Sequence, residues 1–358
     1  MALGGQVGKD SSMQTFPEIS VIVPMKDEAG YAAGCIERLF CQTYPKDRTE
    51  ILVVDGRSRD ETKSIVSSVA ARNGSGPILR LLDNPKSQRA SAMNIGIRNA
   101  KSDVIIRIDA RTEINPDYIE KCVETLLKTG ADNVGGMQAP RVWRNGDPDK
   151  ELTQRAIGLA LSHPFGIGNA QFRLGRQSGY VDTVYLGCFN KNVFSRVGLF
   201  DEDSPVISED SDMNYRIRES GGRVYFNKDI VAYYYPRDNF KELARLYFRY
   251  GGAKAGNFLK IKKFTAWRQL VPPAFLALIV VLGFGSLFSL WAAIAFAFVL
   301  GVYVLAGLLV SAKLAGKERR VSLFGRLLVV FPVLHFSWAT GFFVRLMQRP
   351  EPGRYWGY

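Results

Sequence analysis

The chain has 358 residues, which is too long for one ordinary small domain and indicates two structural units. Its formal net charge is +13, and the excess of lysine and arginine is unevenly placed. Residues 241–268 hold eight basic residues against one glutamate, and residues 269–312 contain no charged residue. This order is typical of a protein at a membrane surface with anionic headgroups. A nucleic-acid partner is not expected, because no recognisable binding module accompanies the basic residues.

The N-terminal residues and the cysteines indicate a cellular compartment. Residues 1–15 are polar and lack an apolar core, so we expect a disordered lead-in and no secretory signal. The four cysteines lack the close paired spacing of a zinc site: Cys35, Cys41, Cys122 and Cys188. They are interpreted as scattered small hydrophobic residues in a reducing compartment. The soluble part is therefore expected in the cytoplasm.

Strand and helix patterns alternate over the first hundred or so residues. Short apolar runs predict strands at 19–23, 51–54, 78–82 and 104–108, the first and the last of them buried. Helical patterns lie between them, the second opened by Ser58 and Glu61 at the spacing of a capping box and the third over 87–99. This alternation predicts an α/β fold with a parallel sheet and helices on both faces.

Two of these strands end in a carboxylate, Asp55 and Asp109, and a further acidic stretch surrounds Asp210. Because open α/β sheets bind ligands outside the carboxyl ends of their strands, the three are expected to converge on one crevice. Carboxylates there can accept hydrogen bonds from a base or a ribose, or hold a cation beside a diphosphate. The alternative is a set of ordinary strands followed by polar loops. No phosphate-binding loop or G-x-G-x-x-G motif supports a kinase or a dehydrogenase.

The C-terminal third predicts a membrane anchor. Residues 239–268 mix aromatic and basic residues, as amphipathic interfacial helices do, with a solvated basic helix as the alternative. Residues 269–346 predict about three transmembrane or re-entrant helices, near 271–290, 291–312 and 327–344, before a tail over 347–358. Basic residues flank the third segment on both sides, at 313–326 and at Arg345, Arg349 and Arg354, so whether it spans the membrane stays open.

Several motifs occur together in the order of one enzyme family. They are Val21-Ile22-Val23-Pro24 with Asp27-Glu28, Val53-Val54-Asp55 with Ser58 and Asp60, Asn94-Ile95-Gly96, Asp109-Ala110-Arg111, and Glu209-Asp210-Ser211-Asp212 followed by Arg216. The chain resembles the family 2 glycosyltransferases, inverting enzymes of the Rossmann-like GT-A fold that use nucleotide sugars. The resemblance implies a GT-A domain over 16–238. Within the family, the chain is similar to bacterial exopolysaccharide transferases of the succinoglycan type, which carry a C-terminal membrane segment.

The resemblance implies a donor site for a UDP-sugar. Asp55 matches the residue that pairs with uracil, and Glu28, after Pro24, is expected near the base or the ribose. Asp109 matches the first acid of the D-x-D motif, close to the ribose and the metal-bound diphosphate. Lys86 and Arg89 could face the diphosphate by position alone, and ordinary surface charges are the alternative. Asp55 and Asp60 could instead be helix-start residues.

The resemblance also implies the catalytic base and the acceptor side. Asp210, beside Glu209, matches the base that takes a proton from the acceptor hydroxyl; a solvated acidic turn is the alternative. Gly187 would let the acceptor approach the backbone, whereas Cys188 is expected to serve packing more than chemistry. The glycine-rich residues 165–179 predict a mobile loop.

One position departs from the family pattern. The third D-x-D residue, normally an acid that ligates metal, is Arg111, and a guanidinium offers no lone pair. Asp109 and the diphosphate could hold Mn²⁺ or Mg²⁺ with water, another residue could replace the missing acid, or Arg111 could supply positive charge to the leaving diphosphate.

A second departure concerns the length of the product. Processive relatives carry Q-x-x-R-W where this chain has Leu246, Arg249 and Tyr250, so only the arginine is kept, and it is expected near the acceptor. Single-sugar transfer from a UDP-sugar to a lipid-linked polyprenyl-diphosphate glycan is therefore expected, at the inner membrane of a bacterium with the catalytic domain in the cytoplasm. A processive synthase and a non-enzymatic scaffold are the alternatives.

Overall fold

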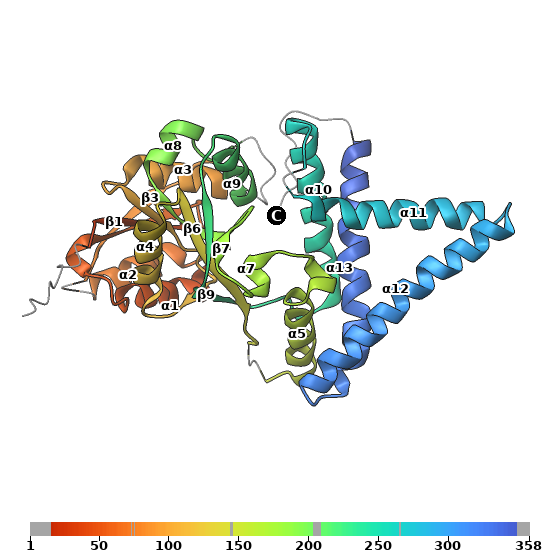
Figure 1. Ribbon diagram of the computed structural model, residues 1–358. Coiled ribbons are helices and arrows are strands. Elements are labelled where there is room, and N and C mark those ends of the chain that lie inside the picture. Colours follow the sequence, from red (N-terminus) through yellow and green to blue (C-terminus); the bar gives the residue numbers. More distant parts are fainter. Residues whose placement is uncertain are drawn as a thin grey trace, which may run out of the picture.

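The computed structural model describes residues 16–72, 74, 76–143, 146–202, 209–264 and 266–348. The predicted lead-in, Arg349, Arg354 and nearly all of the predicted tail lie outside these residues. An α/β domain forms the N-terminal part, and a group of long helices forms the C-terminal part (Figure 1). The two parts meet along α10, the helix Phe240–Ile261.

The sheet of the α/β domain has a parallel half and a mixed half. Its strand order is β3-β2-β1-β4-β8-β6-β9-β5, with β7 paired to β9. The parallel half contains the four predicted strands, β1 (Ile19–Met25), β2 (Thr49–Asp55), β3 (Ile78–Asp83) and β4 (Val104–Arg107). The mixed half contains β5 (Glu113–Ile114), β6 (Asn133–Pro140), β7 (Gly179–Tyr180), β8 (Tyr185–Asn190) and β9 (Val224–Tyr234). The predicted parallel sheet is thus only half of the real one.

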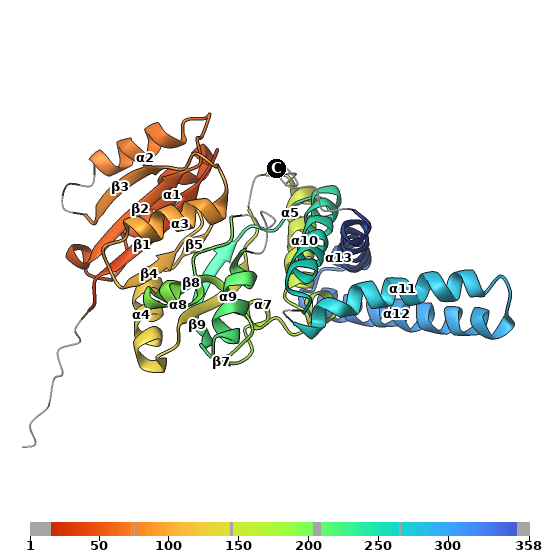
Figure 2. The same cartoon turned by 90° about the horizontal axis from the view of Figure 1, so that it is seen from above.

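Helices cover both faces of this sheet (Figure 2). One apolar cluster joins it to α1 (Ala29–Phe40), α2 (Thr62–Ala71) and α4 (Tyr118–Thr129). The opposite cluster joins it to α3 (Arg89–Asn99), α8 (Asn192–Val197) and α9 (Glu209–Glu219). In β1, Val21 and Val23 belong to the first cluster and Ile22 to the second, so the strand is buried on both faces.

The predicted capping box of α2 is wrong. The helix begins at Thr62, and the side chain of Ser58 makes no cap. Ser58 instead donates to Asp55 and accepts a hydrogen bond from the backbone N–H of Asp27. Residues 58–61 therefore belong to the loop between β2 and α2, where a helix start was expected, and this loop is hydrogen-bonded to the loop after β1.

The C-terminal helices share a third apolar cluster. It joins α10, α5 (Pro148–Leu161), α12 (Leu290–Lys317) and α13 (Ser322–Met347). A 3-10 turn at Trp267–Leu270 leads into α11 (Val271–Gly285), which forms with α12 a hairpin that projects away from the rest of the protein (Figures 1 and 2). Three helices are long and apolar enough to cross a membrane, over 267–285, 290–317 and 322–347. The predicted number of apolar segments is confirmed.

The third of these helices differs from the other two. Within its apolar window, 44% of α13 is buried inside the protein, against 6% and 0% for the windows of the first and second candidates. It crosses the base of the hairpin and runs beside α10 (Figures 1 and 2). Gly251 of α10 and Gly341 of α13 permit this contact, because a Cβ at either would collide with a carbonyl oxygen of the other helix. The backbones therefore touch, which is typical of small residues at helix crossings.

Residues 165–179, expected as a loop without secondary structure, contain part of α6 (Pro164–Ile167) and all of α7 (Gln171–Leu174). The ring of Phe165 packs against Tyr303, Phe331 and His335, and its carbonyl oxygen lies 2.8 Å from Nε2 of His335. The segment is thus packed on the C-terminal helices through an aromatic residue.

Candidate active site

Loops after β1, β2 and β3 meet at the carboxyl edge of the parallel half-sheet. Three of the six described non-glycine residues with positive φ lie in these loops: Asp27 at 52°, Arg57 at 59° and Ser87 at 55°. Such conformations are uncommon outside glycine and gather at functional sites. Half of the described non-glycine residues with positive φ therefore lie at this edge of the sheet.

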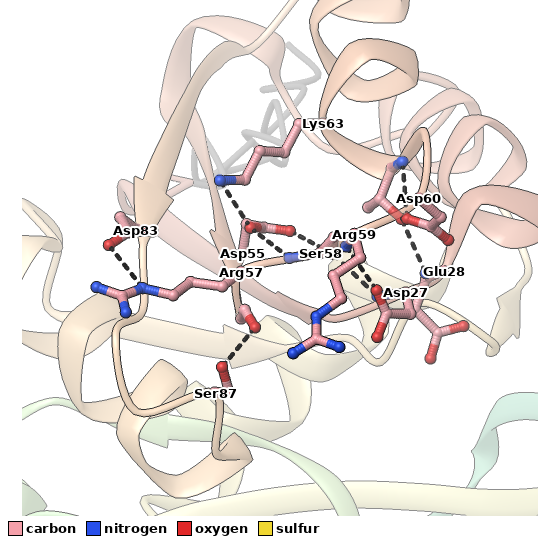
Figure 3. A network of polar contacts seen from close by, with 12 residues as sticks. Asp27, Glu28, Asp55, Arg57, Ser58, Arg59, Asp60, Lys63, Asp83 and Ser87 are labelled. Atoms are coloured by element: carbon pink, nitrogen blue, oxygen red, sulfur yellow. Dashed lines mark hydrogen bonds and ion pairs between the residues drawn. The ribbon is translucent and has the colours of Figure 1, made fainter.

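A network of side-chain bonds joins the first two of these loops (Figure 3). Asp55 is 1% exposed; it accepts from Ser58 Oγ at 2.5 Å and pairs with Lys63 Nζ at 3.2 Å. Asp27 Oδ1 accepts a hydrogen bond from the backbone N–H of Arg59. The carboxylate of Asp60 accepts hydrogen bonds from the backbone N–H groups of Ala29 and Thr62 and from the Thr62 hydroxyl. Asp60 thus ties the loops together, which makes it part of the frame that holds Asp55 and Glu28.

Arg107 joins the two acidic motifs of the site. It is 3% exposed at the end of β4, where its Nε and Nη2 atoms lie 2.8 and 3.2 Å from the two carboxylate oxygens of Asp109. Nη2 also lies 3.0 Å from Oε1 of Glu209, and Arg89 Nη1 approaches the same oxygen at 3.4 Å. The D-x-D and E-D motifs are therefore connected through one buried guanidinium.

This cluster moves the pKa values of neighbouring carboxyls in opposite directions. Burial raises the pKa of Asp210 above its ordinary value of 3.8, and the adjacent Glu209 carboxylate adds to the rise. Burial also acts on Glu209, but Arg89 and Arg107 outweigh it and hold the pKa of Glu209 below its ordinary value. Lys254 of α10 lies close enough to interact with the charge of Asp210, and burial lowers the pKa of Lys254 to about 8. An acidic pair split in this way suits one permanent anion and one proton acceptor.

The raised pKa of Asp210 predicts an acid limit to activity. A general base must be unprotonated, so kcat/KM should fall as the pH drops through this pKa, at a higher pH than an ordinary aspartate would give. A pH profile of kcat/KM in the full-length protein measures it. A profile that stays flat down to the ordinary range of aspartate would contradict this role for Asp210.

Arg111 forms an ion pair with Glu28, which lies in the loop after β1. Its Nε lies 2.7 and 3.0 Å from the two oxygens of Glu28, and its guanidinium lies 5.3 Å from the ring centre of Tyr31. Among the described residues, no group of three His, Cys, Asp or Glu could hold a metal ion. Arg107 takes up two of the roughly four lone-pair positions of Asp109, which leaves room for a cation bound by this one carboxylate. If a cation binds here, Asp109 would be its protein ligand.

A cleft of about 810 Å³ lies between the carboxyl edge of the parallel half-sheet and the C-terminal helices. Pro24, Glu28, Arg89, Asp109 and Arg111 line it from the α/β domain. From α10 it receives Glu242, Leu243, Leu246, Tyr247, Arg249 and Tyr250. The charge of Asp210 acts on Tyr250, so the E-D motif lies close to the α10 side of the cleft. Five of the predicted donor residues and the arginine of the degraded processive motif therefore share one space.

Six of the predicted site residues are not among those that line this cleft: Asp55, Lys86, Gly187, Cys188, Glu209 and Asp210. Lys86 pairs with Glu202 at 2.6 Å. Cys188 is 0% exposed in β8, and burial raises the pKa of its thiol well above the ordinary value, as packing without chemistry requires. Gly187 has φ of 134°, and a Cβ there would overlap the ring of Phe189, so glycine is needed by the core itself.

Sequence patterns missed two cationic residues of the site. Arg107 occupies a position in the buried strand β4, where apolar residues are usual. A charged residue at such a position was the only feature of the sequence that could have indicated its role. Arg173 of α7 also lines the cleft, where it donates to Tyr234 Oη at 2.6 Å and lies over the Phe172 and Tyr234 rings.

Comparison with known proteins settles the family. The model named glycosyl transferase family 2 matches residues 20–185, and the model named glycosyl transferase family group 2 matches residues 104–310. The succinoglycan biosynthesis protein ExoA of Rhizobium meliloti is 30% identical over 334 residues, which cover 92% of this chain and 94% of that protein. The chain belongs to glycosyltransferase family 2. It is a glycosyltransferase with a GT-A fold, as the sequence motifs implied.

Two further similarities extend over most of the chain. A dolichyl N-acetyl-α-D-glucosaminyl phosphate 3-β-D-2,3-diacetamido-2,3-dideoxy-β-D-glucuronosyltransferase of Methanococcus voltae is 25% identical over 92% of this chain and 97% of its own. The mannosyltransferase PcManGT of Pyrobaculum calidifontis, solved with GDP-Man and Mn²⁺, superposes with a TM-score of 0.61 at 19% identity, over 88% of this chain and 86% of its own. An undecaprenyl-phosphate 4-deoxy-4-formamido-L-arabinose transferase of Pseudomonas aeruginosa is 27% identical over 49% of this chain and 51% of its own. Transferases named for lipid phosphates thus recur among the relatives.

Proposed function

We propose that this glycosyltransferase moves a single sugar from a UDP-sugar, with inversion, to a lipid-linked polyprenyl-diphosphate glycan in a bacterial inner membrane. The observation that carries the proposal is the cleft in which Asp109 of the donor motif and Arg249 of α10 face the same space. The donor side lies in the α/β domain over 16–238. The acceptor side lies on α10, which packs on the helix 322–347, one of the three candidate membrane spans.

The donor half of the proposal rests on the carboxyl edge of the parallel half-sheet. Asp55, at the end of β2, would accept from the uracil imide, and Glu28 would lie near the ribose. Lys63 pairs with Asp55 and would have to share this carboxylate with the base. Arg89 and Arg111, which line the cleft, would face the diphosphate and stabilise its negative charge as the sugar leaves.

The acceptor half rests on the acidic pair. Asp210 would take the proton from the acceptor hydroxyl while that oxygen attacks the anomeric carbon and the bond to the UDP oxygen breaks. Glu209, kept ionised by Arg89 and Arg107, would remain an anion throughout. One such displacement inverts the anomeric centre, so an α-linked donor would give a β-linked product. The apolar helices would place a cytoplasmic catalytic domain at the membrane, where the head of a lipid-linked acceptor lies.

We expect Mn²⁺ or Mg²⁺ to stimulate turnover without being indispensable. Asp109 would be the only protein ligand, and the cation would neutralise charge on the leaving diphosphate. Turnover in the presence of a chelator should therefore be reduced but measurable. The variant Arg111→Asp, which restores the second acid of the motif, should widen the ratio between turnover with Mn²⁺ and turnover with chelator. Equal wild-type turnover under both conditions would contradict a metal role.

Product analysis tests the proposed reaction. Membranes that contain the full-length protein are incubated with radiolabelled UDP-sugars and bacterial lipid-linked glycans, and the lipid products are extracted and sized. The proposal predicts a lipid product longer by one β-linked sugar. A ladder of longer products would favour a processive synthase, and no transfer from any UDP-sugar would contradict the proposal.

A further inference from the structure

A second hollow lies on the face of α10 that turns away from the cleft. It has a volume of about 710 Å³ and lies between α10 and α13. Ala244, Arg245, Phe248 and Arg249 line it from α10, and Phe336, Ser337 and Thr340 line it from α13. These seven residues form the interhelix groove. Positions 244, 245, 248 and 249 form one stripe at helical spacing, next to the stripe of α10 that lines the cleft.

Arg249 belongs to both spaces. It lines the cleft together with Tyr250 and the groove together with Phe248, because it lies at the boundary between the two stripes of the helix. A ligand in the groove would therefore reach the catalytic cleft at this one side chain.

The cations of the groove have no anion among the described residues. Neither Arg245 nor Arg249 has an ion pair there, and the Nε atom of Arg249 is buried with no hydrogen-bond partner. Other arginines of the cleft are paired, such as Arg111 with Glu28. A buried donor without an acceptor is costly, so this atom points to an anionic oxygen supplied by a ligand.

The surroundings of the groove select the kind of ligand. Its α13 wall belongs to a helix that is apolar enough to cross a membrane, and aromatic rings from both helices line it. A ligand here must carry an anionic head for the arginines and a hydrocarbon chain for Phe248 and Phe336. Inorganic phosphate supplies only the first of these.

We propose that the interhelix groove binds a long-chain prenyl phosphate or diphosphate, with its phosphate on Arg245 and Arg249 and its chain along Phe248 and Phe336. This inference rests on the proposed lipid-linked acceptor and adds the place where that lipid is held. The glycan attached to the phosphate would pass Arg249 and enter the cleft toward Asp210. The groove thus positions the acceptor hydroxyl through the lipid phosphate.

Lipid binding to the detergent-purified full-length protein tests the proposal directly. Undecaprenyl phosphate is titrated and bound lipid is counted by native mass spectrometry, with undecaprenol, inorganic phosphate and phosphatidylglycerol as separate probes. We expect undecaprenyl phosphate to bind at least about tenfold more tightly than each of the other three. Equal binding of phosphatidylglycerol would identify an unspecific anionic-lipid surface and overturn the proposal.

Variants locate the binding in the groove. Arg245→Ala with Arg249→Gln removes the charges, and Thr340→Trp fills the groove from an exposed position while both arginines stay. Each should weaken binding of undecaprenyl phosphate by roughly tenfold or more, whereas Lys317→Ala at the exposed end of α12 should not. Wild-type binding in both groove variants would overturn the proposal.

A titration with UDP separates the two proposals. Unchanged UDP binding in Thr340→Trp, which keeps both arginines, would show that its loss of lipid binding is not a loss of folding. Lipid binding by a wild-type protein that binds no UDP would refute the proposed donor and leave the groove assignment intact.

Discussion

Asp210→Asn is expected to abolish nearly all sugar transfer while leaving the donor site able to bind. The amide keeps the size of the side chain but cannot accept the acceptor's proton. General bases contribute about 10²–10⁴-fold to rate, so turnover should fall by that factor. Initial rates of lipid glycosylation at saturating UDP-sugar measure the loss.

The matched control is Glu219→Gln on the same helix. Glu219 lies at the far end of α9, is exposed, and pairs at 3.5 Å with Lys263, so its neutralisation should leave turnover unchanged. If Asp210→Asn supported glycan assembly in cells as well as the wild type does, the base assignment would fail. A non-enzymatic role for this chain would then become the better account.

Arg107→Met is expected to damage both stability and activity. The substitution leaves the carboxylates of Asp109 and Glu209 without the buried cation that lies 2.8–3.2 Å from them. Removing one partner of a buried ion pair typically costs about 3–5 kcal/mol, because an uncompensated charge remains. Turnover should fall as well, because Arg107 holds both motifs. Unfolding of the detergent-purified protein measures the stability change, and Arg107→Lys should recover part of both losses.

Arg196→Met provides the comparison for this prediction. Arg196 also pairs with an aspartate, Asp132 at 2.6 Å, but its side chain is 44% exposed. Exposed pairs contribute about 0–1 kcal/mol, so this variant should unfold close to the wild type. If both substitutions lowered the free energy of unfolding equally, Arg107 would stabilise the protein no more than an exposed arginine does, and its proposed role would be contradicted.

The parallel half of the sheet was predictable because its physical signal is local. Buried parallel strands such as 51–54 are continuous apolar runs rich in β-branched residues, and this strand ends at the edge where the candidate site lies. The strand pairing of the mixed half was not predicted. Strand β6 contains Gly135 and Gly136, and its partners β8 and β9 come from distant parts of the chain, so no local period marks them. Pairing between strands that are far apart in the chain determines the structure of the mixed half.

The candidate site likewise has residues that local sequence predicts and residues whose role depends on the folded structure. Asp109 and Glu28 line the cleft as expected, since each follows a strand end. Gly187 and Cys188 were expected near the acceptor, yet Gly187 serves the core and Cys188 is buried within it. The role of Arg107 as the link between two acidic motifs depends on folding, because its partners lie 2 and 102 positions away.

Calorimetric titration of UDP into the detergent-purified full-length protein, with and without Mn²⁺, is the decisive test of a UDP-sugar site. We expect saturable UDP binding that Asp55→Ala abolishes. Asp83→Ala, which removes an exposed carboxylate at the end of the neighbouring strand β3, should leave it unchanged. Absence of UDP binding under both conditions, or wild-type binding in Asp55→Ala, would contradict a UDP-sugar site at this edge of the sheet.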